Sequence, residues 1–140
     1  MRFEASIDIA AAAFDVFAVY VDVERWPQWT PTVTSVERLD PGPLRLGART
    51  RVRQPKLPVA TWEVTELEPG RSFVWVARAV GLLTTARHEV TPSAEGRGAH
   101  VVASLQQDGI FGPFLGGLTR SLTERYLDQE LHGLKARCES

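Results

Sequence analysis

Apolar and polar residues alternate along several short segments of the chain. In residues 2–9, which read RFEASIDI, the apolar side chains share one parity and the polar side chains share the other. This period of two predicts a half-buried strand. Further segments predict strands at residues 32–39, 47–53, 59–67, 72–79, 83–91 and 99–107. The turn-forming stretches DPGP, EPGR and PSAEGRG separate several of them, and such short connections favour an antiparallel meander.

Two other segments have a helical spacing of apolar residues. The first, AAAAFDVFAVYVD at residues 10–22, is expected to bury one face, made of Phe14, Phe17, Ala18 and Val21. Asp22 is expected to cap a second short helix. Pro27 limits that helix to about one turn. Near the C-terminus apolar residues recur at steps of three and four, namely Leu115, Leu118, Leu122, Tyr126 or Leu127, Leu131 and Leu134.

The predicted order is therefore a strand, two short helices, about six more strands and a long helix. An antiparallel sheet of this many strands twists and curls, and its concave face must be covered. Only the C-terminal helix is long enough to cover it, so we expect an α+β fold in which a curved sheet of about seven strands wraps around that helix. Gly116 and Gly117 fall in the first turns of the helix. They either leave room for a ligand or permit close packing, unless the helix begins after them.

Composition and charge restrict the function without defining it. The chain has 140 residues and a net charge of −1, which fits a single domain over residues 1–140 and gives no electrostatic reason to expect nucleic acid as a partner. Cys138 is the one cysteine, so we expect neither an intramolecular disulfide nor a thiolate metal site. There is no signal-peptide pattern and no membrane-spanning run, so we expect a cytoplasmic protein. There is also no metal-ligand spacing and no phosphate-cradling glycine motif, so we expect neither a metal nor a cofactor.

Several stretches resemble one known family. The segment FAVYVDVERWPQWTP, with its Trp-Pro-x-Trp sequence, is the most specific, and the resemblance continues through GARTRVR, WEVTELEPGRSFVW and the Gly-Pro opening of the last helix. Together these stretches resemble the polyketide cyclase/dehydrase family of the START-like (SRPBCC) superfamily over essentially the whole chain. The resemblance implies a helix-grip fold with a deep apolar cavity between the sheet and the last helix. It does not define a reaction, because members of that superfamily have many functions.

The candidate wall of such a cavity is aromatic. Trp62, Phe73 and Trp75 fall on the parity assigned to the concave face, although Val74 and Val76 make the opposite parity of residues 72–79 almost as apolar. Aromatic walls suit a planar apolar ligand, and ordinary core packing is the alternative for each residue. His88 has the inward parity of its strand. It is expected either to hydrogen-bond a ligand and act as an acid or base, or to be a buried structural histidine.

The segment DGIFGPFLGG precedes the last helix and carries apolar side chains among glycines. This composition suits either a gate over the cavity or a staple that anchors the helix. From this segment and the helix we expect five residues to shape the entrance or the helix side of the cavity: Phe111, Phe114, Gly117, Leu118 and Leu122.

Three functions fit these patterns. The first is binding of a small hydrophobic, ring-containing molecule. The second is a polyketide aromatase/cyclase or dehydratase, in which the cavity would orient a poly-β-ketone and His88 would be the acid or base. No strong catalytic motif is present, so an enzyme is not established. The third is a protein-interaction module, for which Trp26 or Trp29 should lie on the surface. The sequence does not fix the ligand or the oligomeric state.

Overall fold

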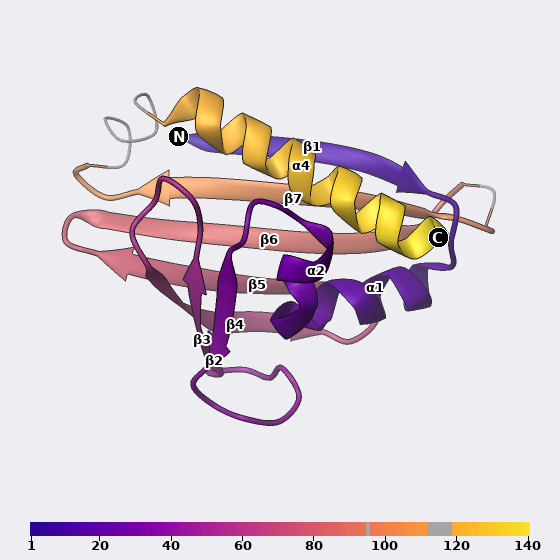
Figure 1. Cartoon of the computed structure of the whole chain (residues 1–140), viewed down its shortest axis with the longest axis horizontal. Coiled ribbons are helices and arrows are strands. Elements are labelled where there is room, and N and C mark those ends of the chain that lie inside the picture. The colour runs from indigo at the N-terminus through magenta and orange to yellow at the C-terminus, as the bar shows by residue number, and fades with distance from the viewer. Residues whose placement is uncertain (95, 112–118) are drawn as a thin grey trace.

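A computed structural model describes residues 1–94, 96–111 and 119–140. The described residues form one antiparallel seven-stranded sheet with the order β1-β7-β6-β5-β4-β3-β2, shown in Figure 1. The strands are β1 (Arg2–Ile9), β2 (Ser35–Arg38), β3 (Arg49–Arg53), β4 (Ala60–Glu68), β5 (Ser72–Ala79), β6 (Leu82–Pro92) and β7 (Ala99–Asp108). All seven expected strands are present, and two of them have the expected bounds.

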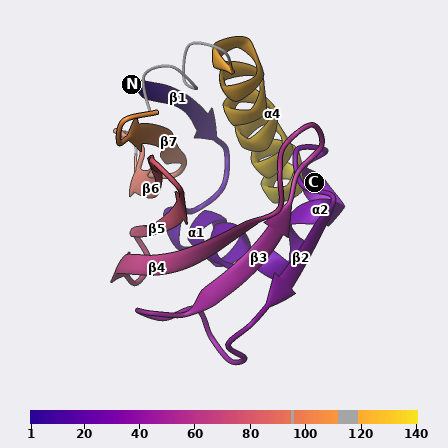
Figure 2. The same cartoon turned by 90° about the vertical axis from the view of Figure 1, so that its left-hand side faces the viewer.

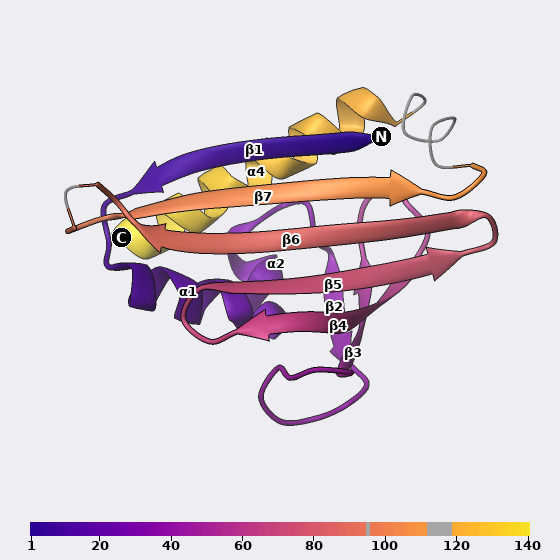
Figure 3. The same ribbon diagram turned by 180° about the vertical axis from the view of Figure 1, so that it is seen from behind.

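The helices all lie on one side of the sheet. They are α1 (Ala13–Val21), η1 (Val23–Arg25), α2 (Trp26–Trp29) and α4 (Arg120–Glu139). Seen from the end in Figure 2, the strands form an open arc, and α4 lies inside it beside β1. Figure 3 shows the opposite face of the sheet in front of the helices, with no helix covering it. The expected helix-grip architecture is therefore confirmed. No helix in the described ranges is long and apolar enough to cross a membrane.

A register shift in β4 determines which of its side chains face the arc. Val64 is opposite Trp75 and Glu66 is opposite Val74, so Thr65 is an extra residue on one side of the ladder. Such a bulge turns the following residues to the other face. Without it, Glu66 would share the inward parity of Val64. With it, Glu66 lies on the outer face.

The outer face of β5 is also buried, which explains the ambiguous pattern of residues 72–79. Val74 lies between Glu66 of β4 and Arg87 of β6, and only 1 % of it is exposed. Arg87 and Glu66 form an ion pair of 3.4 Å across it. The apolar stems of such long side chains cover the surface beneath them. The inward assignment of Phe73 and Trp75 is nevertheless correct, because both belong to the buried core cluster that includes the helices.

The buried face of α1 differs from the expected one. Phe14 is 75 % exposed, and the buried residues are Val16, Phe17 and Tyr20. The helix is therefore rotated relative to the expectation, so that the tyrosine faces the core. Tyr20 is not among the residues expected on the buried face, but its ring is fully buried and its hydroxyl bonds to a carboxylate on α4.

One glycine of α4 allows the helix to touch α2. A Cβ atom at Gly133 would overlap the carbonyl oxygen of Trp29 and would also crowd its ring. Close approach of backbones is a common reason for glycine within a helix, where it otherwise costs about 1 kcal/mol relative to alanine. Close packing is also one of the alternatives expected for Gly116 and Gly117, which lie outside the described residues.

Candidate functional site

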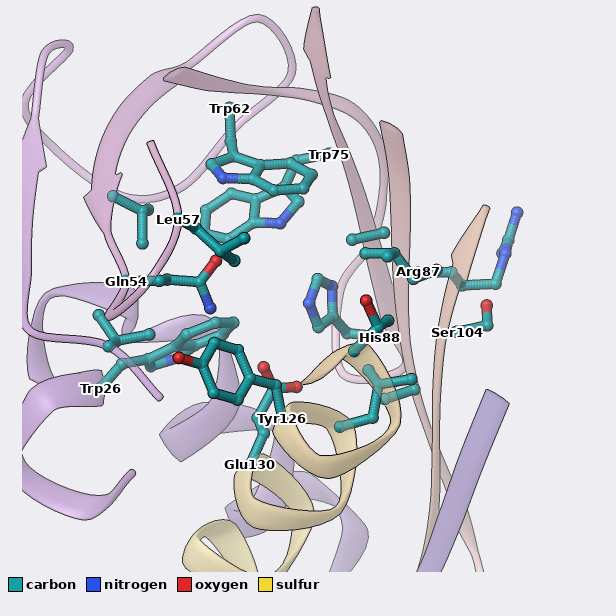
Figure 4. A pocket seen from close by; sticks show the side chains of 17 residues that line it. Trp26, Gln54, Leu57, Trp62, Trp75, Arg87, His88, Ser104, Tyr126 and Glu130 are labelled. Carbon is teal, nitrogen blue, oxygen red and sulfur yellow. The ribbon is translucent and has the colours of Figure 1, made fainter. Parts of the chain in front are cut away.

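A cavity of about 90 Å³ lies between the sheet and the N-terminal half of α4. Its apolar walls come from α2, the strands, α4 and the connections that follow α2 and β3. They consist of Trp26, Val33, Val52, Leu57, Trp62, Trp75, Ala86, Ala103, Leu105 and Leu127. Its polar lining residues are Gln54, Arg87, His88, Ser104, Thr123, Tyr126 and Glu130. Figure 4 shows Arg87 and Ser104 pointing away from the hollow, so their side chains do not contribute to its polar surface.

Three tryptophans form the aromatic wall. The rings of Trp62 and Trp75 stack with centroids 5.6 Å apart and planes at 29°. Trp26 lies 5.5 Å from Trp75 at 57°, and its indole N–H donates to the carbonyl of Tyr20 at 2.9 Å. That hydrogen bond fixes the ring at the start of α2. Trp26 and Trp29 are both buried, which does not support the interaction-module reading.

The imidazole of His88 faces the cavity and is only 4 % exposed. Its Nδ1 atom lies 3.2 Å from the carbonyl oxygen of Phe73, and the ring stacks on Phe73 with centroids 4.1 Å apart. Burial lowers the pKa of His88 to about 3, and the hydrogen bond to Phe73 opposes this effect. The ring is therefore neutral near pH 7. A carbonyl can only accept, so Nδ1 carries the proton and Nε2 carries the lone pair.

A buried carboxyl lies across the cavity from Trp62 and Trp75 (Figure 4). Glu130 of α4 accepts a hydrogen bond of 2.5 Å from the hydroxyl of Tyr20. Burial raises the pKa of Glu130 to about 7, and the bond from Tyr20 opposes this rise. Burial, followed by the charge of Glu130, raises the pKa of Tyr20 well above its usual value. Tyr20 is therefore the donor of the pair, and Glu130 can gain or lose a proton near neutral pH.

The loop between β3 and β4 forms the remaining wall. The hydroxyl of Tyr126 on α4 donates to the carbonyl of Pro55 and so ties the helix to this loop. In Figure 4 the amide of Gln54 points into the hollow. Across the described ranges this amide has no hydrogen-bond partner.

The structure brings together some of the residues expected at the site. Trp62, Trp75 and His88 line the cavity, whereas Phe73 lies behind His88 and does not. Leu122 is half-buried on α4 and is outside the lining.

The expected entrance residues are further away or are not described. The amide of Phe111 donates to the carbonyl of Gly81 at 2.9 Å, at the tip of the β5–β6 hairpin, and Phe111 is also outside the lining. Phe114, Gly117 and Leu118 lie outside the described residues.

Two residues of the cavity, Glu130 and Gln54, are not among those expected from the sequence. For Glu130 a signal was present, because it is three residues after Leu127 and four before Leu134, within the apolar stripe of the helix. A carboxylate in such a stripe indicates a buried partner. Gln54 had no comparable signal, because its position depends on a loop. Within the described ranges no cluster of three His, Cys, Asp or Glu residues could hold a metal ion.

Comparison with protein families gives a match over residues 1–139. The matching family model is described as polyketide cyclase/dehydrase and lipid transport. No curated protein matches the chain.

Solved structures of similar fold include proteins with and without a named activity. A hypothetical protein of Helicobacter pylori has a TM-score of 0.84 at 14% identity, with 99% of this chain and 88% of that chain covered. A START superfamily protein of Mycobacterium smegmatis has a TM-score of 0.77 at 16% identity, with 99% and 97% covered. The Zhui aromatase/cyclase of a Streptomyces species has a TM-score of 0.74 at 17% identity, with 99% and 93% covered. At these identities the likeness extends to the fold alone.

Proposed function

The chain belongs to the polyketide cyclase/dehydrase and lipid transport family, and on this premise we propose that it binds a small hydrophobic, ring-containing molecule in the cavity beneath α4. The observation that supports this most directly is the composition of the cavity. Three tryptophans and several aliphatic side chains surround a hollow into which a few polar groups project. Binding sites for small molecules usually combine an apolar lining with a few placed polar groups.

The volume limits the size of this ligand. Pockets for drug-sized molecules usually exceed about 300 Å³, and an engineered cavity of about 150 Å³ admits benzene. At about 90 Å³, this cavity suits at most a single ring, with part of the ring in the opening. A polycyclic compound would require Leu57 and the rest of the β3–β4 loop to move.

A cavity-filling substitution tests this proposal. Ala86 is 7 % exposed and lines the cavity, so the larger side chain of Ala86→Leu should occupy the space that the ligand needs. We expect calorimetric titration with single-ring compounds to show binding to the wild type and at least tenfold weaker binding to this variant. Ala79→Leu, at the exposed end of β5, is the matched control and should bind as the wild type does. The absence of binding across a broad panel of ring compounds would refute the proposal.

A second candidate function is a cyclase or dehydratase activity. The specific observation in its favour is the carboxyl of Glu130, which lines the cavity and has a pKa of about 7. An acid or base is most effective when its pKa is near the working pH. The pKa of about 3 makes His88 a poor proton carrier at pH 7, so Glu130 is the better nominee for this role.

The enzyme proposal has its own experiment. Single-turnover assays with a short β-ketone substrate would compare the wild type with Glu130→Gln, which keeps the shape of the side chain and removes its titration. We expect turnover to fall at least a hundredfold while calorimetric binding of the substrate is retained. His88→Phe should reduce binding more than the chemical step. Turnover that survives in Glu130→Gln would contradict the acid–base role.

A further inference from the structure

The polar groups that face the cavity have unfilled hydrogen-bonding capacity. The Nδ1–H of His88 is used by the carbonyl of Phe73, so the free atom of the ring is Nε2, which can only accept. It has no partner in the parts of the chain that the structure describes. Nε2 is not among the fully buried unpaired atoms of the described residues, so it is open to the cavity. A ligand that donates to Nε2 would pair it there.

Glu130 adds a second acceptor in its ionised form, which is populated together with the protonated form near pH 7 because the pKa of this carboxyl is about 7. Its Oε2 atom receives the hydroxyl of Tyr20, whereas Oε1 has no partner within the described ranges. The amide of Gln54 faces the same hollow and offers both a donor and an acceptor (Figure 4). The cavity is therefore rich in acceptors.

The cavity also lacks a positive charge. Among the lining residues of the described chain, Arg87 is the only Lys or Arg, and its side chain points away from the hollow (Figure 4) toward Glu66 on the outer face. A carboxylate ligand would be buried near Glu130 without a compensating cation, which is strongly unfavourable. The site should therefore exclude anionic ligands such as fatty acids and benzoates.

We propose that the ligand of this cavity is an uncharged single-ring compound with a hydroxyl group, a phenol or a cyclic enol, that donates to Nε2 of His88 and lays its ring against Trp62 and Trp75. This inference rests on the proposed binding function and names its ligand class. The hydroxyl oxygen has lone pairs left to accept from the amide of Gln54. The ring is matched to the aromatic wall, against which offset or edge-on contacts are favourable.

Calorimetric titration with four probes of similar size tests the proposal. These are phenol, toluene, benzoate and benzylamine at pH 7, which present a neutral donor, an apolar methyl group, an anion and a cation. Toluene is similar in size to phenol but more hydrophobic, so toluene would bind more tightly than phenol in a site that recognised only apolar surface. We expect phenol to bind about tenfold more tightly than toluene, and benzoate to show no binding.

Two variants assign the preference to its residues. His88→Phe keeps an aromatic ring on Phe73 but removes the acceptor, so the preference for phenol over toluene should disappear. His132→Phe is the matched control, because His132 also bonds a backbone carbonyl through Nδ1 but is exposed on α4. If His88→Phe does not fold, Gln54→Leu, at a side chain without hydrogen bonds, should reduce the phenol preference by about threefold.

The outcomes separate this inference from the proposed function. Toluene binding as tightly as phenol would overturn the hydroxyl assignment and leave hydrophobic binding intact. Benzylamine binding more tightly than phenol would overturn it in favour of a cation site around Glu130. No binding by any of the four probes would count against the cavity as a site for ring compounds altogether.

Discussion

The two halves of α4 meet the rest of the molecule in different ways. In the C-terminal half, Gly133 lets the helix backbone touch the carbonyl of Trp29, and Leu131 and Leu134 are fully buried. In the N-terminal half, Tyr126 bridges the helix to the β3–β4 loop, and the cavity remains beneath it. One helix thus closes the fold at one end and leaves it hollow at the other.

This contrast shows how side-chain size can determine where a cavity forms. From the sequence, one alternative for the glycines at the start of the last helix is that they leave space for a ligand. In the C-terminal half of α4, glycine has the opposite effect, because the missing side chain of Gly133 lets two backbones come together. The cavity lies instead beneath the part of α4 that carries the large side chains of Tyr126 and Glu130, and both of them line it.

The largest effect should come from filling the contact at Gly133. In Gly133→Leu the new side chain would meet a backbone carbonyl that cannot move aside. We expect the free energy of unfolding to fall by more than about 3 kcal/mol, at the upper end of overpacking effects. Urea denaturation measures this change, with Ala136→Leu on the exposed side of α4 as the matched control. Equal stability of the two variants would show that the close contact is not a constraint.

The buried carboxyl of the open half should make stability depend on pH. The pKa of Glu130 is about 7 in the folded state, against an ordinary 4.5, so the folded protein holds this proton over a range in which the unfolded chain has released it. The contribution of Glu130 to the free energy of unfolding is fully present below pH 4.5 and is lost as the pH rises toward 7. The difference between the two pKa values corresponds to roughly 3 kcal/mol.

Glu130→Gln removes this dependence. Its free energy of unfolding relative to that of the wild type should increase by roughly 3 kcal/mol between pH 4.5 and pH 7.5. Urea denaturation across this range measures the change, and Glu124→Gln on the exposed face of the same helix is the control for loss of a carboxylate. Parallel pH profiles for the wild type and Glu130→Gln would mean that the carboxyl is ionised at no unusual cost.

The smallest expected changes in stability come from two tyrosines, Tyr126 on α4 and Tyr20 on α1, each of which makes one hydrogen bond between α4 and another element. Tyr126→Phe removes one hydrogen bond to the carbonyl of Pro55 and should cost about 1 kcal/mol. Hydrogen exchange should then be faster at the amide of Leu57, which donates to Gln54 within the same loop.

Tyr20→Phe is the comparison for this variant. It leaves the buried Glu130 without its donor and should cost about 2 kcal/mol without affecting exchange in the β3–β4 loop. Unchanged exchange at Leu57 in Tyr126→Phe would show that the tyrosine does not hold the loop.

Much of the fold could be predicted from the sequence because strand periodicity and turn residues are local signals. The bounds of β1 and β5 were predicted correctly, and the order of elements followed from them. The orientation of α1 was not, because Phe14 and Phe17 are equally apolar and only the packing of Tyr20 against α4 determines which face is buried.

The site was less predictable than the fold. Strand parity identified Trp62, Trp75 and His88, which line the cavity. The partners that give the cavity its chemistry come from other elements, since Gln54 lies on a loop and Glu130 on the helix. Their convergence depends on tertiary contacts that no local pattern contains. For Phe114, Gly117 and Leu118 the expected role stays a prediction.

The extra residue at Thr65 has a consequence for how the protein can change in length. Because Thr65 is the extra residue of the bulge, its deletion would restore regular alternation after Val64 and leave Glu66 on the outer face and Leu67 toward the arc. Deletion of another residue of β4 would instead move the side chains beyond it to the opposite face. A one-residue deletion should therefore be tolerated at Thr65 and in the loops at the ends of β4, but not elsewhere within the strand.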